Sequence, residues 1–497
     1  MNNKLDELKE ILTKARIYNH AINILYFDVE TIAPKDALED ENNTMNYFYN
    51  ELFKILNNDH VNNLVIDLYK EKDNLDYYDK LLIEKLYEAY LKNKNITPEF
   101  DLKRNKIYSK SYVNWLKAKE AKDYNLFKES FNEVINIQRE EINLRDNKLS
   151  NVYDNLLNDC EKGVLQEDLD KFFNELKLGL IDLINKIKSS KHIIRDDFLN
   201  RKVSIYKQEQ FSKYLLELNG FNLNRGVLST TEHPFTSEIS RYDSRVTTHY
   251  YEDNVLSNIY SVIHEGGHAI FMQNELEEDH DHFINDYITN GMHESVSRFY
   301  ENVVGRSKEY THLIYPKFIE IFDEFKDITE QELYEAINIV KPSLIRTEAD
   351  EVTYGLHIII RYEMERMISN NEISLDEVPN KWNELYTKYL GVTPKNDSEG
   401  VLQDVHWSGG FGYFPSYALG NAYNAMYVQK MKEDIDFNNC ILKGDFKTIN
   451  NWMKENIFKE ANHLTPKEWI LNITNNSLNA NDFLDYLYKK YSDIYKF

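Results

Sequence analysis

Apolar side chains recur at every third or fourth position through most of this sequence, and that spacing constrains the fold more than any other feature. Leu5, Leu8 and Leu12 form one such series, and the segment 165–176 contains another. Side chains at this spacing share one face of a helix, which can pack against a neighbour. The 497 residues include only 16 glycines and 9 prolines, too few for a many-turned all-β fold. We therefore expect a mostly α-helical protein.

The character of the chain changes near residue 220. Residues 1–220 show the pattern of long helices joined by short polar turns, and Gly220 can adopt the left-handed conformation that ends a helix. Residues 245–252 are rich in β-branched and aromatic side chains, which is typical of a strand. We predict one continuous unit, with a helical groove-and-roof part (1–220) and a motif-bearing part (221–497). The second part is expected to contain a small β-sheet beside the helix predicted over 255–276.

The charge of the chain excludes several classes of partner. Acidic residues number 83 and basic residues 59, so the formal net charge is −24. Such a surface repels phosphate backbones and anionic headgroups, and we expect neither nucleic-acid nor membrane partners. No apolar run reaches the roughly 18 residues of a bilayer span, and the N-terminus lacks a signal-peptide core. Two cysteines are too few for a disulfide framework, which favours a cytoplasmic location.

The sequence His264-Glu265-Gly266-Gly267-His268 fits the pattern H-E-x-x-H. Positions i and i+4 share a helix face, so both imidazoles can bind one cation. Zn²⁺ suits such ligands and lowers the pKa of a bound water to about 7, and Glu265 can accept a proton from that water. The alternative is a pair of solvated histidines. Two glycines, each costing about 1 kcal/mol in a helix, favour the metal site because they suit a close approach to the backbone.

A catalytic zinc site needs a third protein ligand and one open position. Glu294 is our candidate, because it lies 29 residues beyond Glu265 on a second helical stripe that stops at Gly305. Arg298 occupies the position where thermolysin-type enzymes carry an acid, which argues against a thermolysin relative. Rival ligands form a polar cluster that we interpret as a solvated loop. Its members are Glu275, Glu277, Glu278, Asp279, His280, Asp281 and His282.

Six short motifs occur in an order that is characteristic of one known family. They are His233-Pro234-Phe235, the stretch DSRVT (243–247), HEGGH, His293-Glu294-Ser295, IRTEAD (345–350) and GVLQDVHW (400–407). With these motifs the chain resembles the carboxypeptidase Taq-type thermostable metallocarboxypeptidases. The resemblance implies a helical fold with a deep groove, a homodimer, and release of single amino acids from peptide C-termini with broad specificity.

The same resemblance implies roles for residues at the matching positions. His264, His268 and Glu294 match the family's metal ligands, for one Zn²⁺ or Co²⁺ ion per chain, and Glu265 matches its catalytic acid/base. The substrates would be peptides with a free C-terminal carboxylate. Arg346 is the best candidate to bind that carboxylate through two parallel hydrogen bonds, although its spacing also suits an ion pair with Asp350.

Other residues are weaker candidates for substrate binding. Arg245 is a second carboxylate ligand, but Asp243 beside it favours a structural ion pair. A donor to the scissile carbonyl oxygen is needed as negative charge develops there. We expect it among His406, Tyr413 and Tyr417, which could alternatively pack the groove wall. His233 and Phe235 are expected to line the pocket for the residue next to the cleaved bond.

Two other functions remain open. A zinc endopeptidase, such as an oligopeptidase, shares H-E-x-x-H and a helical groove. The second alternative is a helical binding scaffold that holds a structural metal and has no catalytic activity. Glu265 argues against it, because a structural metal site needs no base and normally has four protein ligands.

Overall fold

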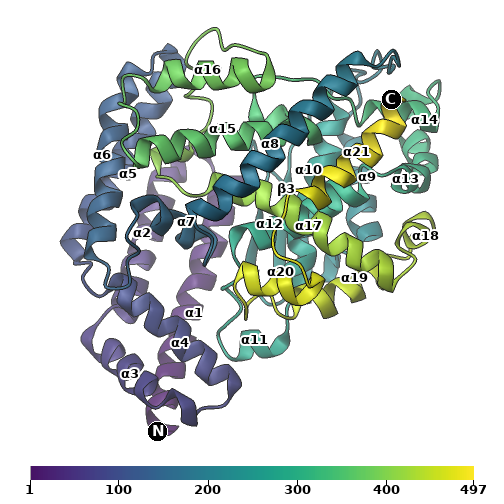
Figure 1. The fold of residues 1–497 in the computed structure, drawn as a ribbon. Coiled ribbons are helices and arrows are strands. Elements are labelled where there is room, and N and C mark those ends of the chain that lie inside the picture. Colours follow the sequence, from purple (N-terminus) through teal and green to yellow (C-terminus); the bar gives the residue numbers. More distant parts are fainter. Residues whose placement is uncertain (1) are drawn as a thin grey trace.

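The structure, a computed structural model, describes residues 2–497, and helices dominate it (Figure 1). The mostly helical fold expected from the apolar spacing is confirmed. The helices before the sheet are α1 (Asn2–Thr31), α2 (Leu38–Leu56), α3 (Asp59–Lys70), α4 (Tyr77–Asn93), α5 (Pro98–Ala121), α6 (Asn125–Leu144), α7 (Val152–Cys160), α8 (Gln166–Ser189) and α9 (Ile205–Asn219). None of the helices in the described residues is both long and apolar enough to cross a membrane.

The helices after the sheet carry most of the sequence motifs. They are α10 (Val255–Asn274), α11 (Glu277–Asp281), α12 (Asn290–Arg298), α13 (Lys308–Ile321), α14 (Glu330–Ala336), α15 (Glu351–Ser369), α16 (Val378–Leu390), α17 (Phe414–Asp434), α18 (Phe437–Leu442), α19 (Phe446–Met453), α20 (Pro466–Thr474) and α21 (Asn481–Tyr495). A π-helical turn, Phe299–Val304, continues α12 directly.

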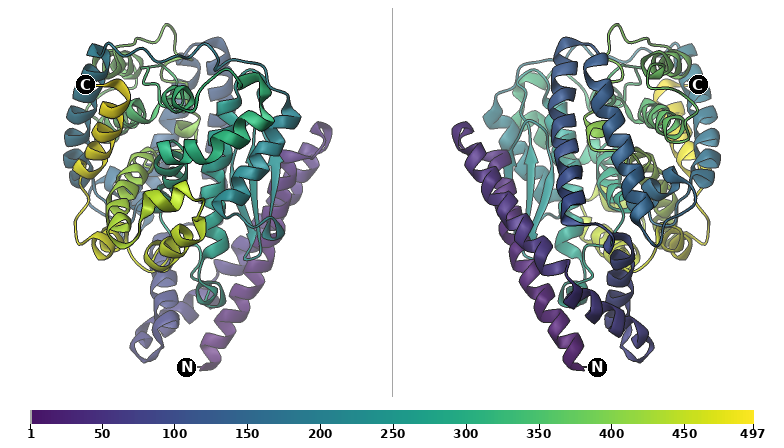
Figure 2. Two further views of the ribbon diagram at one scale, coloured as in Figure 1. Left: turned by 90° about the vertical axis from the view of Figure 1, so that its right-hand side faces the viewer. Right: turned by 90° about the vertical axis from the view of Figure 1, so that its left-hand side faces the viewer.

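A small sheet lies beside α10, as the sequence predicts. Its strands are β1 (Gly226–Thr230), β2 (Thr236–Ser240) and β3 (Asp243–Thr248), in the order β1-β3-β2. β1 pairs parallel with β3, and β2 pairs antiparallel with it. The strand expected over 245–252 therefore begins two residues earlier and ends at Thr248. The long helix α1 runs along the β2 side of the sheet (Figure 2), and α10 packs against β2 and β3.

Local signals in the sequence set the ends of the helices that flank the sheet. Gly220 ends α9 with φ +102°, the left-handed conformation expected there. The Asn254 side chain accepts a hydrogen bond from the Ser257 backbone N–H and so caps α10. These two caps fix where the chain leaves the helical N-terminal part and where the H-E-x-x-H helix begins.

Within residues 2–497, most of the buried apolar residues belong to one large core or to one small core. The large core contains residues from α5 to α21, including the buried faces of α10, α12 and α17. The small core joins α1, α3 and α4 through Leu8, Val65 and Ile83, at the end of the molecule that projects downwards in Figure 1. Because α10 and α12 belong to the large core, their facing side chains are held by extensive packing.

Candidate metal centre

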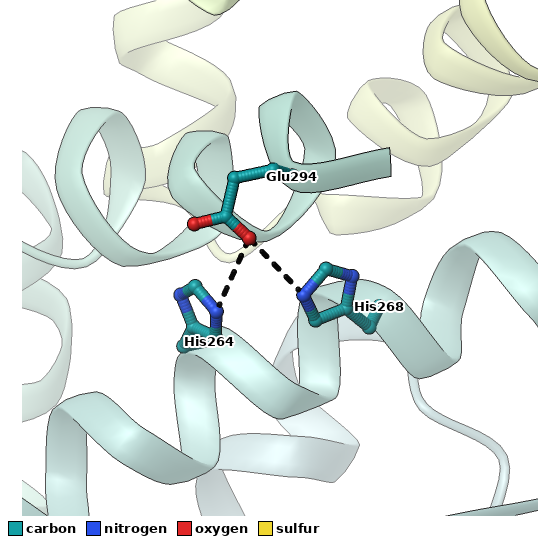
Figure 3. A group of neighbouring side chains, drawn as sticks. All are labelled: His264, His268 and Glu294. Carbon is teal, nitrogen blue, oxygen red and sulfur yellow. Dashed lines mark ion pairs between the residues drawn. The ribbon is translucent and has the colours of Figure 1, made fainter. Parts of the chain in front are cut away.

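Two histidines from α10 and a glutamate from α12 converge on one point (Figure 3). The Oε2 atom of Glu294 lies 3.7 Å from Nε2 of His264 and 3.4 Å from Nε2 of His268. In a tetrahedral zinc site with Zn–N bonds of about 2.0–2.1 Å, neighbouring ligand atoms are about 3.3–3.4 Å apart. The donor set and its spacing therefore fit a divalent ion with three protein ligands.

Glycine allows the two helices to come this close. A Cβ atom on Gly267 would lie 2.8 Å from Cα of Ser297 in α12. A Cβ on Gly420 of α17 would lie 2.8 Å from Cγ of Glu294. The close approach that the paired glycines suggested is thus made by α12 itself, and α17 packs closely against Glu294.

Glu301 and Arg298 hold the ligands in orientation. Nδ1 of His264 lies 2.9 Å from Oε2 of Glu301, which leaves Nε2 facing Glu294. Nε of Arg298 donates to Oε1 of Glu294 at 2.8 Å, and its Nη1 donates to Glu301 at 3.1 Å. A metal-binding histidine typically has such a carboxylate partner on its other ring nitrogen. Glu301 is not among the residues predicted from the sequence, where its only signal is a position seven residues, or two helical turns, after Glu294.

Neighbouring charges keep both carboxylates ionised. Burial alone would raise the pKa of Glu294, but the charges of His264 and Arg298 outweigh it and hold that pKa well below its usual range. Burial is likewise outweighed at Glu301, where Arg298 and His264 lower the pKa to about 2. At neutral pH the two carboxylates carry the negative charge that a divalent cation needs in a buried site.

His293 orients the ring of His268, as Glu301 orients the ring of His264. The Nδ1 atoms of the two rings form a hydrogen bond. Burial, together with the nearby His268, lowers the pKa of His293 well below its ordinary value, so its ring is neutral at physiological pH. The motif residue before Glu294 therefore orients a second imidazole of the cluster.

The Glu265 side chain is positioned by the edge of the sheet. Oγ1 of Thr236, the first residue of β2, donates to Oε2 of Glu265 at 2.7 Å, and it also lies 2.9 Å from the Glu265 backbone oxygen. Glu265 is 9% exposed. Thr236 is not among the residues predicted from the sequence, although it follows His233-Pro234-Phe235 directly.

Arg346 forms its ion pair with a residue other than the one that spacing suggested. Its Nε donates to Asp404 at 2.9 Å and its Nη1 to the Tyr354 hydroxyl at 3.2 Å. Asp350 instead accepts hydrogen bonds from the backbone N–H groups of Val352 and Thr353 at the start of α15. The alternative pairing of Arg346 with Asp350 is therefore wrong, because Asp350 is the N-cap of a helix.

The aromatic candidates gather around Arg346. Its guanidinium carbon lies 5.0 Å from the centre of the Tyr417 ring. The Tyr417 hydroxyl lies 3.4 Å from Nε2 of His406, and Tyr413 packs edge-on against Tyr417 with 39% of its surface exposed. Burial lowers the pKa of His406 to about 4. The structure thus groups His406, Tyr413 and Tyr417 beside Arg346.

Two of the three remaining candidates, Phe235 and Arg245, pack against α1. Phe235 packs against Tyr26 at a ring-centre separation of 5.6 Å, whereas His233 is exposed. Arg245 forms an ion pair with Asp243 at 2.8 Å and lies over the Phe27 ring. Arg245 thus makes the structural pairing that its neighbour suggested.

The polar cluster after α10 is not the solvated loop that the sequence predicts. Residues Glu277–Asp281 form the short helix α11. Asp279 and His280 are buried, and the Glu275 side chain is 2% exposed. The interpretation is wrong for Glu275, Asp279 and His280, because tertiary packing against β2 and the segment near Asn462 covers them, which no local pattern reveals. Glu277, Glu278 and Asp281 are exposed, as the interpretation expected.

Two imidazoles one helical turn apart, a carboxylate from a neighbouring helix and an adjacent glutamate, on a mostly helical scaffold, define a metallopeptidase. The family model of the carboxypeptidase Taq (M32) metallopeptidases matches residues 7–491. The chain belongs to this family, as its six motifs predicted, and the enzyme is a metallocarboxypeptidase.

Known proteins match over nearly the full chain. It is 38% identical to Carboxypeptidase 1 of Bacillus subtilis and 32% identical to Thermostable carboxypeptidase 1 of Pyrococcus furiosus, covering 98% of this chain and of the relative in both comparisons. The M32 carboxypeptidase from Deinococcus radiodurans has a TM-score of 0.96 at 26% identity, with both chains covered fully. Metallocarboxypeptidase 1 of Trypanosoma cruzi has a TM-score of 0.94 at 28% identity, covering 99% of this chain and 100% of that one.

Proposed function

We propose that this enzyme is a zinc-dependent carboxypeptidase that releases amino acids one at a time, with broad specificity, from peptide C-termini. The observation that carries the proposal is the convergence of His264, His268 and Glu294 with Glu265 alongside. The proposal includes one ion per chain, with Co²⁺ as an alternative to Zn²⁺. It also includes a homodimer, a cytoplasmic location, and a groove roofed by residues 1–220 over the catalytic part 221–497.

The metal, when bound by the three ligands, supplies a Lewis acid that polarises the scissile carbonyl and acidifies a water molecule. Glu265 accepts a proton from that water molecule, and the oxygen of the water adds to the carbonyl carbon. The protonated Glu265 then donates to the leaving nitrogen as the C–N bond breaks. Thr236 holds one carboxylate oxygen of Glu265, which restricts the side chain to one orientation during both transfers.

Arg346 is the proposed ligand of the C-terminal carboxylate. Asp404 and Tyr354 hold its Nε and Nη1 atoms, so the guanidinium is oriented before substrate arrives. Burial opposes the charge of Arg346, but Asp404 outweighs it and raises the pKa of Arg346, which keeps the cation charged at every physiological pH. His406, Tyr413 and Tyr417, close to this cation, are proposed to contact the substrate, with His233 and Phe235 further along. Arg245 is the weaker carboxylate candidate, since Asp243 already neutralises it.

Digestion of one peptide, prepared with a free and with an amidated C-terminus, tests the proposal. Mass spectrometry should show a ladder of single losses from the free acid, little change in the amide, and no reaction after chelation. Internal cuts in both peptides would instead identify an endopeptidase. A metal-binding protein that cuts neither would be a scaffold without catalysis.

A further inference from the structure

A second group of metal-type ligands lies at the other end of the catalytic helix. Glu238 belongs to β2, Glu275 follows the last residue of α10, and His280 belongs to α11. One ligand atom from each lies within 4.8 Å of the others. Nε2 of His280 is 3.3 Å from Oε2 of Glu275 and 3.9 Å from Oε1 of Glu238. We call these three residues the helix-end cluster.

The Glu275 carboxylate has one oxygen that the protein leaves unsatisfied. Its Oε1 accepts a hydrogen bond from Nδ2 of Asn462 at 3.1 Å. Its Oε2 is buried and, among residues 2–497, has no hydrogen-bond partner. The side chain is only 2% exposed and Oε2 points at His280. A buried carboxylate oxygen without a donor is costly, and a bound cation would satisfy it.

The surrounding groups are mostly acidic, and they include the nearby Asp286. Burial and the neighbouring acids raise the pKa of Glu238 to about 8 and that of Glu275 well above its usual range, so a cation binds here by displacing their protons. Arg16 faces Glu238 and partly offsets this repulsion. Arg16 donates to the backbone oxygen of His280, and Arg241, the other nearby cation, is paired with Glu277 and Asp281. The carboxyl end of α10 adds the negative end of its helix dipole.

An ion can reach the cluster from an adjoining cavity. Glu238, His280 and Asp286 line a cavity of about 900 Å³ between α1, α3, α4 and the β2 edge. Water in that cavity can complete the coordination of an ion that takes only three protein ligands.

We propose that the helix-end cluster binds a second divalent transition-metal ion, with two carboxylates and one imidazole as ligands. This donor set suits Zn²⁺, Mn²⁺ or Co²⁺. At a rise of about 1.5 Å per residue, the seven residues from His268 to Glu275 separate this ion from the catalytic centre by about 10 Å along the helix. The second ion ties β2, which carries Thr236 against Glu265, to the end of the helix that carries both histidine ligands.

Metal counting on the full-length protein tests the proposal. The protein is stripped with a chelator, dialysed against Zn²⁺ and, separately, Mn²⁺, and its metal content is measured by mass spectrometry. With Zn²⁺ we expect two ions per chain in the wild type, one in His264→Ala/His268→Ala, one in Glu275→Gln/His280→Ala, and none in the fourfold variant. The double variant of the catalytic histidines isolates the second site, so its result does not depend on the proposed activity.

The controls separate a bound ion from a folding defect. Glu277→Gln changes an exposed acid beside the cluster and should retain two ions. In the His264→Ala/His268→Ala background, added Zn²⁺ should raise the melting temperature, and the further change Glu275→Gln, which keeps the size of the side chain, should abolish that shift. The proposal is overturned if the wild type saturates at one ion, or if the His264→Ala/His268→Ala protein binds none and shows no thermal shift.

Discussion

The Nδ1 atom of His264 lies 2.9 Å from Oε2 of Glu301, so a carboxylate of the π-helical turn fixes the ring of a proposed metal ligand. The π-helical turn continues directly from the helix that carries Glu294. One element thus supplies both a ligand and the group that orients another ligand. Arg298 donates a hydrogen bond to each of the two carboxylates, and its positive charge offsets the repulsion between them. π-Helical turns inside helices occur frequently at functional sites.

Replacing Glu301 with Gln should weaken zinc binding by about 10- to 100-fold, the usual effect of losing a carboxylate behind a metal-binding histidine. Gln can keep a hydrogen bond to His264 but not the negative charge. Competition with a chromogenic chelator measures the change. Glu320→Gln, an exposed change on α13, is the control. Equal zinc affinity in both variants would remove Glu301 from metal binding.

Glu265→Gln should bind zinc as tightly as the wild type and lose about 100- to 10,000-fold in turnover, the range for a general acid–base group. The amide cannot accept the proton from water, whereas its size and its contact with Thr236 are retained. Metal content and kcat are measured on the same sample. Near-wild-type turnover with metal bound would reject the acid–base role.

Arg346→Ala should reduce kcat/KM for free-acid peptides by about 10- to 100-fold, since hydrogen bonds to a charged group contribute about 1.5–3 kcal/mol. Peptides amidated at the C-terminus should be affected far less. Arg361 continues to pair with Asp404 in this variant, so that carboxylate is not left alone. Arg366→Ala, which removes the ion pair between Arg366 of α15 and Asp170 of α8, is the control. Equal losses on acid and amide would contradict carboxylate recognition by Arg346.

Gly267→Ala should destabilise the protein and loosen its metal site. The new Cβ would meet Cα of Ser297 at 2.8 Å, and backbone atoms cannot move aside cheaply. Overpacking of this kind costs about 1–3 kcal/mol. Gly409→Ala is the matched control, because its nearest neighbour would lie 3.7 Å away. Chemical unfolding and zinc affinity are measured for both. A Gly267→Ala protein as stable as the control would show that α10 and α12 can separate freely.

Stability should fall as pH rises through the range in which Glu161 ionises. Burial raises the pKa of Glu161 from 4.5 to about 7, against hydrogen bonds from Thr289 and the Gly291 N–H. Between these pH values the unfolded chain loses the proton first, so deprotonation favours unfolding. One group contributes at most about 3 kcal/mol across this range.

The variant Glu161→Gln removes this contribution. The difference in unfolding free energy between pH 5 and pH 8 should therefore be smaller in the variant than in the wild type, as urea titrations would show. Glu365, also buried with a pKa raised to about 7, remains in both proteins and serves as the internal reference. An unchanged pH dependence would mean that Glu161 stays protonated or stays charged throughout.

Much of the fold and part of the candidate site could be predicted from the sequence. The helical stripes, the cap at Asn254 and the strand near residue 245 follow from local spacing and residue type. His264 and His268 share a face because any α-helix places i and i+4 together. The ion pair between Arg346 and Asp404 could not be predicted from local spacing, because it depends on the path of the long loop before α17.

The helical class, the order of the family's motifs and the two imidazoles on one helical turn all follow from local patterns in the chain. Three contacts became visible only in the folded molecule: Glu301 with His264, Thr236 with Glu265, and the buried Glu275 with His280. The difference between the two groups is the sequence separation of the residues involved. Helical geometry fixes neighbours within a turn or two, whereas contacts between segments depend on how whole faces pack, and that packing is a property of the entire core.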